Sequence, residues 1–439
     1  MYMPILSVIL PSLNMRNYIG ECLKSILSQS FTDLEIISVD AMSSDGTKDI
    51  LEQYARLDSR IILKQCDVRS YGKQVNIGIK EAKGDYVAIV DTDDYIARDM
   101  YQKLIEKAKK YKLDYVKAGY FRHYEFSDRE VYEERCDIIP ENKYKDKIIN
   151  ANVCPCMHCW DGYLWAGIYR REFLLKNGIT LNESSGAAFQ DVGFFHQVTN
   201  EAENVMYLDY YGYYYRINRA GNSISSINGI KYMYDEYTRI LDNRFIIEEK
   251  QLKYVCVKMV YSLMAECEKK AIVEALDSDV VKIYLDKFVD LVKSKFSLGI
   301  INSNDFSVND IKEIEYLLND KKGYMDNIRK RIYKKEDFLN KCKLLSIKSN
   351  LVIFGSGIRG KSLIDMLLVN GMNISYIIDN DCNKWGENIH NIEIVPLEKV
   401  IHDNNVYIVA IKGFESEITK QLIDNEISID NIIVPEIYN

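Results

Sequence analysis

The chain is 439 residues long, 47% hydrophobic and 28% charged, with a net charge of −8. A chain of this length usually forms roughly two or three domains, and its acidic balance argues against a nucleic-acid-binding protein, which normally carries a basic face. No apolar run approaches the roughly 20 residues that span a bilayer, and the start lacks the pattern of a signal peptide. Its 10 cysteines, without regular spacing, favour a reducing compartment over a disulfide framework. We therefore expect a cytoplasmic protein.

Residues 1–115 alternate strand and helix patterns, which is typical of a mostly parallel sheet. The predicted strands are short apolar runs, and the predicted helices carry apolar residues three and four positions apart. Strands are predicted at 7–10, 34–39, 61–64 and 86–90, and helices at 18–27, 49–57 and 74–82. This part of the chain therefore has the pattern of an α/β domain.

Acidic residues follow two of these predicted strands. Asp40 comes directly after the strand at 34–39, and Asp91 opens an acidic segment after the strand at 86–90. In open α/β sheets, ligands bind outside the carboxyl ends of the strands. We therefore expect Asp40 and Asp91 at the same sheet edge, where a nucleotide would lie.

The triplet Asp91-Thr92-Asp93 has two interpretations when it is taken alone. Carboxylates at positions i and i+2 can hold a divalent cation, which acts as a Lewis acid and neutralises the charge of a departing diphosphate. Acidic residues are also common in ordinary turns. Without further context the turn carries more weight, so the surrounding sequence has to decide.

Residues 116–228 are less regular and very aromatic, with a run of tyrosines at 210–215 that is interrupted only by Gly212. Aromatic rings that line a cleft can stack on the apolar faces of sugars. The same rings can equally be core residues whose hydroxyl groups found partners. Both interpretations carry similar weight.

Residues 229–345 have helical patterns, with apolar residues at 281, 284, 285, 288 and 292 and capping candidates at Asp277 and Ser278. Two local clusters in the chain have an ordinary explanation that we favour. The basic stretch at 329–335 fits a solvated helix face better than contact with an anionic membrane. The cysteines at 154, 156 and 159 lack the second distant pair of a structural zinc site and fit buried thiols.

The last part of the chain carries a dinucleotide-type fingerprint. A predicted strand at 351–354 is followed by Gly355, Gly357 and Gly360, and then by a helix that runs to residue 368. A second predicted strand at 374–378 ends at Asp379, at the spacing expected for the acidic residue of that fingerprint. These four residues define a second candidate nucleotide site in a Rossmann-like unit.

Further blocks surround the acidic triplet in a fixed order. They lie at 7–14, 29–36, 39–47, 71–78, 82–86 and 91–95, and later at 165–174, 186–194, 215–216 and 222–225. Together they resemble family 2 glycosyltransferases, and in particular a branch that is common in capsule and surface-polysaccharide clusters. The resemblance covers residues 1–240 and favours the metal interpretation of the triplet.

This resemblance implies a GT-A fold and an inverting transfer of a sugar from a nucleotide diphosphate. By matching motifs, Asp40 would bind the base, expected to be uracil, Asp93 would bind Mg²⁺ or Mn²⁺, and Asp91 would lie near the ribose or the metal. Asp191 falls where the family keeps the general base that removes the acceptor proton. The predicted nucleotide-binding residues are Pro11, Leu13, Asn14, Asp40, Asn76, Asp91, Thr92 and Arg216, the last in a late loop near the diphosphate.

The sequence departs from the family pattern at two positions. The second acidic residue expected after the strand at 34–39 is Ala41, which leaves the base contact to Asp40 alone. The common Glu-Asp pair of the base motif is Gln190-Asp191, and a glutamine cannot act as a base. Asp191 is therefore the one carboxylate of that pair.

We expect a GT-A domain at 1–228, a helical region at 229–345 and a Rossmann-like domain at 346–439. The expected function is transfer from a UDP-sugar to a lipid-linked or oligosaccharide acceptor in bacterial surface-polysaccharide synthesis, with peripheral contact to the inner membrane as an open question. The main alternative is a protein that binds NAD or a nucleotide-sugar, or an oxidoreductase, acting through the C-terminal unit. A sugar nucleotidyltransferase is disfavoured, because residues 11–14 lack a glycine-rich pyrophosphate loop.

Overall fold

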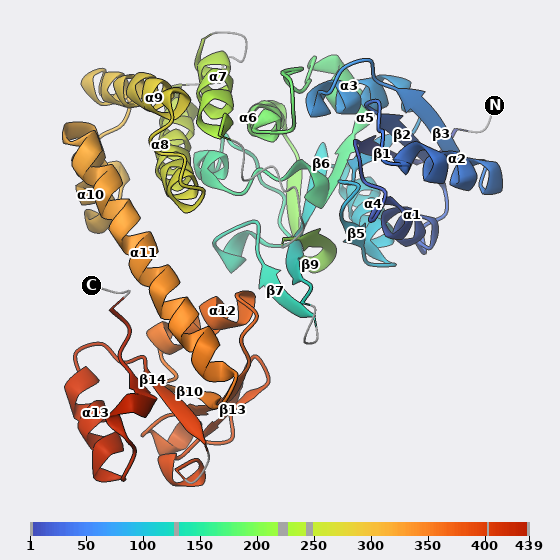
Figure 1. Ribbon diagram of the computed structural model, residues 1–439. Coiled ribbons are helices and arrows are strands. Elements are labelled where there is room, and N and C mark those ends of the chain that lie inside the picture. The colour runs from blue at the N-terminus through green and yellow to red at the C-terminus, as the bar shows by residue number, and fades with distance from the viewer. Residues whose placement is uncertain (1–2, 127–130, 218–226, 243–248, 402–403, 437–439) are drawn as a thin grey trace. The chain divides into compact units, whose positions relative to one another are not determined.

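The computed structural model describes residues 3–126, 131–217, 227–242, 249–401 and 404–436 (Figure 1). The chain forms two compact units. The first unit comprises Met1–His123 and Glu133–Tyr324, and the second comprises Tyr124–Tyr132 and Met325–Asn439. Each unit has its own β-sheet.

The sheet of the first unit has the strand order β3-β2-β1-β4-β8-β6-β9-β5, with β7 paired to β6. Its strands are β1 Leu6–Ser12, β2 Leu34–Asp40, β3 Ile61–Gln65, β4 Tyr86–Ile89, β5 Tyr95–Ile96, β6 Tyr115–Tyr124, β7 Tyr132–Cys136, β8 Gly167–Arg170 and β9 Val205–Arg216. Strands β1 to β4 are parallel, whereas β8 pairs antiparallel with both β4 and β6. The predicted α/β alternation of residues 1–115 is therefore confirmed.

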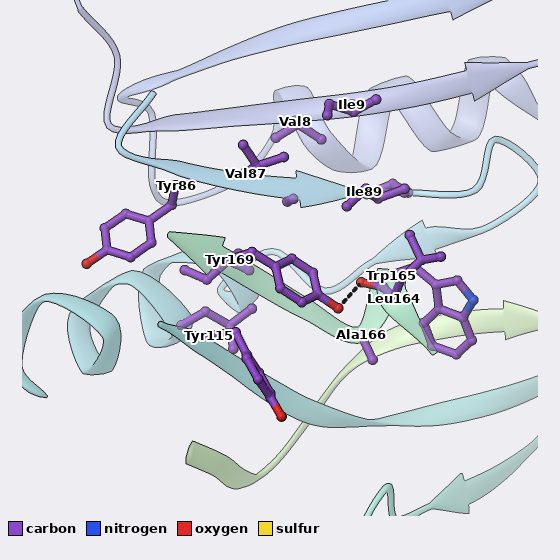
Figure 2. Packing of buried hydrophobic residues seen from close by; sticks show 14 of the residues in the cluster. Val8, Ile9, Tyr86, Val87, Ile89, Tyr115, Leu164, Trp165, Ala166 and Tyr169 are labelled. Carbon is purple, nitrogen blue, oxygen red and sulfur yellow. Dashed lines mark hydrogen bonds between the residues drawn. The ribbon is translucent and has the colours of Figure 1, made fainter. Parts of the chain in front are cut away.

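Helices join the strands of this sheet and cover it, as Figure 1 shows for α1, α2 and α3 beside β1, β2 and β3. The helices are α1 Ile19–Leu27, α2 Thr47–Leu57, α3 Tyr71–Glu81, α4 Met100–Tyr111, α5 Arg171–Lys176 and α6 Gln190–Glu201. Every residue of β1 and β2 is buried, as expected for parallel strands with both faces covered. Figure 2 shows Val8 and Ile9 of β1 and Val87 and Ile89 of β4 in the core that they share with Trp165 and Tyr169.

The segment that the sequence pattern left irregular contributes four strands, β6 to β9, to the same sheet. The tyrosine run at 210–215 lies in β9, which pairs with β6 and β5. Its rings occupy both faces of the strand, so the alternation of polar and apolar residues that marks a strand is missing. Tyr207 and Tyr213 are 2% and 0% exposed, and for these two rings the core interpretation is correct.

The region after β9 is helical, as predicted. Its helices are α7 Gly229–Leu241, α8 Glu249–Ile272, α9 Asp279–Ser297, α10 Val308–Asn319 and α11 Lys321–Ser346. The side chain of Ser278 caps α9 by accepting a hydrogen bond from the backbone N–H of Val281 at 3.3 Å. The basic stretch at 329–335 lies within α11, with Lys330, Arg331, Lys334 and Lys335 exposed. None of the helices in the described ranges is both long and apolar enough to cross a membrane.

The second unit has a Rossmann-like sheet, with the strand order β12-β13-β11-β10-β14-β15. Its strands are β10 Asn350–Phe354, β11 Ile374–Ile378, β12 Asn388–Ile389, β13 Ile392–Val395, β14 Asn405–Val409 and β15 Ile432–Ile433, and its helices are α12 Ile358–Val369 and α13 Glu415–Asp424. Strands β13, β11, β10, β14 and β15 are parallel neighbours in that order. Their order corresponds to 3-2-1-4-5 of a doubly wound fold.

Helix α3 packs closely against β1 at Gly78, where a Cβ atom would lie 2.4 Å from Cγ2 of Ile9. Gly20 in α1 is a matched control, because the nearest heavy atom to its Cβ would be the Tyr54 hydroxyl at 4.0 Å. Both alanine substitutions gain helix propensity, but only Gly78→Ala overpacks the core. We expect Gly78→Ala to be less stable than Gly20→Ala by about 1–3 kcal/mol in denaturant unfolding. Equal stability of the two variants would contradict this close packing.

Candidate active site

Three parallel strands end side by side at one edge of the first sheet. Ser12 at the end of β1 pairs with Asp40 at the end of β2, and β4 on the other side of β1 leads into Asp91. The buried side-chain amide of Gln74 ties this edge together, because its Nε2 donates to the carbonyl oxygens of Ser12 at 2.9 Å and Val39 at 2.6 Å. The predicted shared edge of Asp40 and Asp91 is confirmed.

Asp40 is 4% exposed, and its two carboxylate oxygens differ in their hydrogen bonding. Its Oδ2 accepts a hydrogen bond from the backbone N–H of Ser43 at 2.9 Å. Its Oδ1 is buried and has no hydrogen-bond partner within the described parts of the chain. A buried acceptor without a hydrogen-bond partner lowers the stability of the fold by about 1–3 kcal/mol. A hydrogen bond from a ligand would remove this penalty, so Oδ1 marks a candidate ligand contact.

The loops on either side of Asp40 are joined by side-chain contacts. Asn14, with a φ of +55°, accepts a hydrogen bond from the backbone N–H of Ser44 and donates its own N–H to the Ser43 hydroxyl, both at 2.9 Å. Thr92 is 2% exposed and donates its hydroxyl to the carbonyl of Pro11 at 3.0 Å. The predicted residues Pro11, Leu13, Asn14 and Thr92 thus lie together at this edge, although Asn14 and Thr92 also hold its loops in place.

The acidic segment after β4 is held by strand β9. The Tyr213 hydroxyl accepts from the backbone N–H of Asp91 at 3.1 Å and donates to Oδ2 of Asp94 at 2.8 Å. The backbone N–H of Arg216 donates to Oδ1 of Asp94 at 2.8 Å, and its Nε donates to the carbonyl of Asp93 at 3.0 Å. Both ends of the segment are therefore fixed by one strand.

Negative charge is concentrated in this acidic segment. Burial raises the pKa of Asp94 well above its usual value, and the charges of Asp93 and Asp91 raise it further. In the part of the chain that the structure describes, no group of three or more His, Cys, Asp or Glu side chains is arranged to hold a metal ion by itself. Carboxylates that hold Mg²⁺ commonly share it with substrate phosphates, so Asp91 and Asp93 fit a cation bound together with a diphosphate.

Arg216 is 4% exposed at the end of β9. Its Nη2 donates to Oε2 of Glu21 at 2.7 Å, and its guanidinium carbon lies 5.1 Å from the centre of the Tyr18 ring. These contacts fix the arginine beside the acidic segment, where a planar cation is suited to phosphate recognition. The predicted contact with the diphosphate stays a prediction, and the motif block at 222–225 lies outside the described residues.

Asp191 lies in the first turn of α6 and keeps some exposed surface. Burial of its carboxyl group raises the pKa of Asp191, while backbone N–H groups at the helix start oppose this shift. The Tyr71 hydroxyl donates to Oδ1 of Asp91 at 2.7 Å, and burial together with the charges of both Asp91 and Asp191 raises the pKa of Tyr71. The candidate base and the acidic segment therefore both act on one phenol.

Two residues that accompany these aspartates in the motifs have structural contacts. Gln190 is 2% exposed, and its Nε2 donates to Oγ of Ser184 at 3.0 Å. Asn76 bonds the backbone of Leu181 through both atoms of its amide, each at 2.9 Å. Asn76 therefore holds the segment that leads to Asp191, and its predicted contact with the nucleotide stays a prediction.

An aromatic cluster packs against Tyr213, the residue that holds the acidic segment. The Trp165 ring stacks on Tyr213 at a centroid distance of 4.1 Å, on Tyr163 at 4.8 Å and on Tyr215 at 5.4 Å. Trp165 is 5% exposed, whereas Tyr163 and Tyr215 keep some exposed surface. Sequence reasoning did not single out Tyr71 or Tyr213, and nothing in one sequence separates Tyr213 from the other tyrosines of its run.

The cysteine cluster at 154–159 contains free thiols and a histidine that faces another histidine. Cys154 and Cys156 are free thiols whose sulfur atoms lie 2.8 Å apart. His158 points instead to His196, with their Nδ1 atoms 3.0 Å apart, and burial lowers the pKa of His158 to about 4. Cys154 is buried, Cys156 and Cys159 are half-buried, and the two histidines form a buried pair.

The glycines of the second unit adopt the geometry of a strand-to-helix turn. Gly355 has a φ of +116°, and a Cβ on Gly360 would lie 1.8 Å from the Gly355 carbonyl oxygen, so α12 packs directly on the turn. A Cβ on Gly357 would meet open space. Both carboxylate oxygens of Asp379 accept local hydrogen bonds, from the backbone of Ser356 at 3.1 Å, from Lys384 at 3.0 Å and from the backbone of Asp381 at 2.9 Å. The second nucleotide site stays a prediction, and a ribose would have to displace these partners.

Known proteins match the first half of the chain. Residues 7–174 match the family model described as glycosyl transferase family 2. The uncharacterized glycosyltransferase EpsJ of Bacillus subtilis is 33% identical over 228 residues, which are 51% of this chain and 64% of EpsJ. Glycosyltransferase GlyA of Streptococcus pneumoniae is 26% identical over 52% of this chain and 32% of its own length. The match thus spans less than two thirds of either relative.

A longer match and a solved structure extend the comparison. The cholesterol galactosyltransferase of Borreliella burgdorferi is 24% identical over 70% of this chain and 88% of its own length. The crystal structure of S. aureus TarS 1–349 in complex with UDP-GlcNAc has a TM-score of 0.55 and 20% identity, and the match covers 76% of this chain and 91% of that one. At this identity the likeness shows a shared fold. The ordered motif blocks, the α/β sheet with acidic residues at its carboxyl edge and these matches agree: residues 7–174 match a glycosyl transferase family 2 domain.

Proposed function

We propose that this protein is an inverting glycosyltransferase that moves a sugar from a UDP-sugar to an acceptor hydroxyl. The observation that carries the proposal is the grouping of Asp40 and the acidic segment at Asp91 and Asp93 at one edge of the first sheet, with Asp191 of α6 and Asp91 both acting on Tyr71. Each of these aspartates fits a different task. The chain spans only 64% of EpsJ and 32% of GlyA, so donor, acceptor and mechanism are all part of this proposal.

The nucleotide would lie along the ends of β1, β2 and β4. The buried, unpartnered Oδ1 of Asp40 is suited to accept a hydrogen bond from the imide N–H of uracil. Because Ala41 has no polar side chain, Asp40 would make this contact alone. TarS 1–349, which shares this fold, was crystallised with UDP and with UDP-GlcNAc, and this supports UDP as the nucleotide of the donor.

Asp93 and Asp91 would hold Mg²⁺ or Mn²⁺ beside the diphosphate. The cation would supply positive charge that stabilises the leaving diphosphate. The protein supports this arrangement through Tyr213 and Arg216, which fix the backbone of the acidic segment. The buried carboxylates of Asp93 and Asp94, 8% and 1% exposed, are crowded enough to favour a bound cation.

Asp191 would act as the general base in a single displacement. As the acceptor oxygen attacks the anomeric carbon, the bond from that carbon to the diphosphate oxygen breaks and the acceptor proton passes to Asp191. The raised pKa of Asp191 makes it a stronger base than an exposed carboxylate. Gln190 cannot share this role, since its amide holds the preceding segment.

The acceptor would be a hydroxyl of a lipid-linked saccharide or an oligosaccharide in bacterial surface-polysaccharide synthesis. Two further relatives support a polymer acceptor by their descriptions: a putative teichuronic acid biosynthesis glycosyltransferase, 43% identical over 105 residues, and a poly(ribitol-phosphate) beta-glucosyltransferase, 39% identical over 98 residues. A location at the cytoplasmic face of the membrane is part of the same proposal, and the cysteine usage of the sequence supports its reducing, cytoplasmic side.

Replacing Asp191 with asparagine removes the base while keeping its shape. We expect transfer to fall by about 10²–10⁴-fold with UDP affinity nearly unchanged, as measured by product formation and calorimetry. In the wild type, kcat/KM should rise with pH through the raised pKa of Asp191, because only the carboxylate accepts a proton. Asp67→Asn, which removes an exposed carboxylate, should behave as wild type. Full activity of Asp191→Asn would exclude Asp191 as the base.

The metal role of Asp93 can be tested without activity. We expect the wild type to bind UDP at least about ten times more tightly in Mn²⁺ or Mg²⁺ than in EDTA, because the cation joins the phosphates to the carboxylates. Asp93→Ala should lose this difference while keeping the metal-free affinity. Calorimetric titration with UDP measures all four cases. Equal binding of UDP by the wild type with and without metal would refute the metal site.

A further inference from the structure

The segment that precedes Asp191, residues 179–189 (called the strap below), is held on one side by α3. The backbone N–H of Tyr71 donates to the carbonyl of Gly186 at 2.9 Å, and Asn76 bonds the backbone of Leu181 at two points. A Cβ on Gly72 would lie 1.9 Å from the carbonyl oxygen of Asn182, so the strap lies directly on the helix. The contacts on this side of the strap therefore come from α3, which lies within the family-matched residues 7–174.

Two glutamine side chains of helix α6 form hydrogen bonds with the strap. Gln197 forms a reciprocal pair with the backbone of Thr180, donating through Nε2 at 2.8 Å and accepting through Oε1 at 3.2 Å. Gln190 donates to Oγ of Ser184 at 3.0 Å and to the carbonyl of Gly186 at 3.2 Å. The strap is thus hydrogen-bonded to the helix that carries Asp191 at three of its residues.

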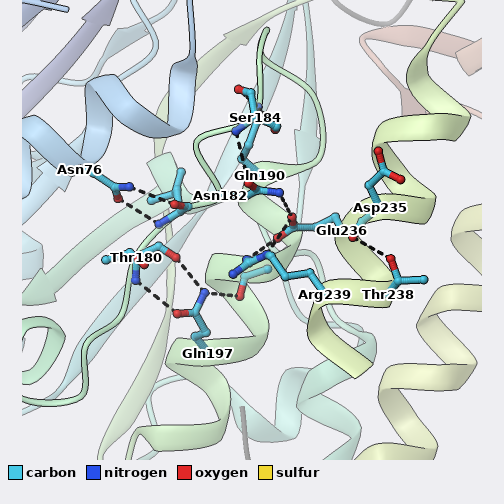
Figure 3. A network of polar contacts seen from close by, with 12 residues as sticks. Asn76, Thr180, Asn182, Ser184, Gln190, Gln197, Asp235, Glu236, Thr238 and Arg239 are labelled. Atoms are coloured by element: carbon cyan, nitrogen blue, oxygen red, sulfur yellow. Dashed lines mark hydrogen bonds and ion pairs between the residues drawn. The ribbon is translucent and has the colours of Figure 1, made fainter. Parts of the chain in front are cut away.

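The other side of the strap is held by α7, through an ion pair between a buried glutamate and a partly exposed arginine (Figure 3). Glu236 of α7 is 2% exposed, and its Oε2 accepts from Nδ2 of Asn182 at 2.8 Å. Both carboxylate oxygens also accept from Arg239, Oε1 from Nη2 at 2.6 Å and Oε2 from Nε at 3.2 Å. This bidentate pair fixes the carboxylate in one orientation.

The same ion pair lies against the backbone of α6. A Cβ on Gly193 would lie 1.7 Å from Oε1 of Glu236 and 2.3 Å from Nη2 of Arg239. Any side chain at Gly193 would therefore displace the pair. Gly193 stands two residues after Asp191, in the same helical turn.

We propose that Glu236 and Arg239 are positioning residues for Asp191: their ion pair, with its carboxylate buried, holds the strap and the first turns of α6 so that the Asp191 carboxylate faces the acceptor. The inference rests on the role proposed above for Asp191. It makes α7, which lies beyond the family-matched residues 7–174, part of the catalytic unit. An ion pair whose carboxylate is buried adds little net stability compared with well-packed apolar residues, so its fixed geometry is the reason to place one here.

The charge of Glu236 also acts on Asp191. Burial is the main cause of the raised pKa of Asp191, and the Glu236 carboxylate raises it further, while Lys269 of α8 opposes the shift. The other ionisable groups on which the Asp191 charge acts are Tyr71 of α3, Lys117 of β6, Tyr163, Tyr169 of β8 and Tyr237 of α7. Removing the Glu236 charge therefore lowers the pKa of Asp191, since one source of negative charge is lost.

The test compares Glu236→Gln with Asp235→Asn in the full chain. Asp235 is a suitable control because it lies on the same helix but is exposed and paired with Lys231 at 2.9 Å on the surface. We expect Glu236→Gln to lower kcat by about 10- to 100-fold, as small misplacements of catalytic groups do, with the affinity for UDP unchanged. The acid limb of its pH profile should move to lower pH. Asp235→Asn should match the wild type in all three measurements.

A second pair of variants separates positioning from folding. Arg239→Lys keeps the positive charge and Arg239→Met removes it, so kcat should be higher for the lysine variant at equal UDP affinity and equal circular dichroism. If Glu236→Gln does not fold, this pair decides the question by the same measure. Wild-type kcat and pH profile in Glu236→Gln, or equal kcat in the two Arg239 variants, would overturn the inference. If the inference is overturned in this way but Asp191→Asn is inactive, the proposed function still stands. Full activity of Asp191→Asn would overturn both the base role of Asp191 and the positioning role of Glu236 and Arg239.

Discussion

The phenol of Tyr213 is the contact on which the arrangement of the acidic segment depends. It accepts from the backbone of Asp91 and donates to the side chain of Asp94, so one hydroxyl joins the start and the end of the segment. Three neighbouring carboxylates repel one another, and without a fixed backbone they would turn toward water. Strand β9 thus gives the first sheet a rigid acidic edge, and the stacked Trp165 ring keeps the phenol in place.

The two sides of the candidate site are built in different ways. The nucleotide side consists of strand ends that are buried and tied by Gln74, so it is formed by the sheet itself. The base side consists of the strap, which has no sheet partners of its own beyond the bridge from Ser70 to Gly186 and depends on side chains from three helices. Nucleotide recognition can therefore survive changes that disturb the position of Asp191.

The sequence was most informative where contacts are local. Strands β1, β2 and β4 and the edge with Asp40 and Asp91 could be predicted because short apolar runs and the turns after them lie close together in the chain. Strand β9 was missed because tyrosines on both faces hide the alternation. The contact of Glu236 with Gly193 could not be predicted, since a helical glutamate and glycine show no sign of their partner until the fold brings the two helices together.

The position of α7 has a consequence for how such a domain can be exchanged between proteins. A gene fusion or recombination event that carried over only residues 7–174 would transfer the nucleotide side of the site and leave behind both the strap and the helix that holds it. If α7 positions Asp191 as proposed, the smallest module that contains the whole proposed site extends at least to Leu241, the end of α7. The family-matched segment and the unit needed for activity would then have different boundaries.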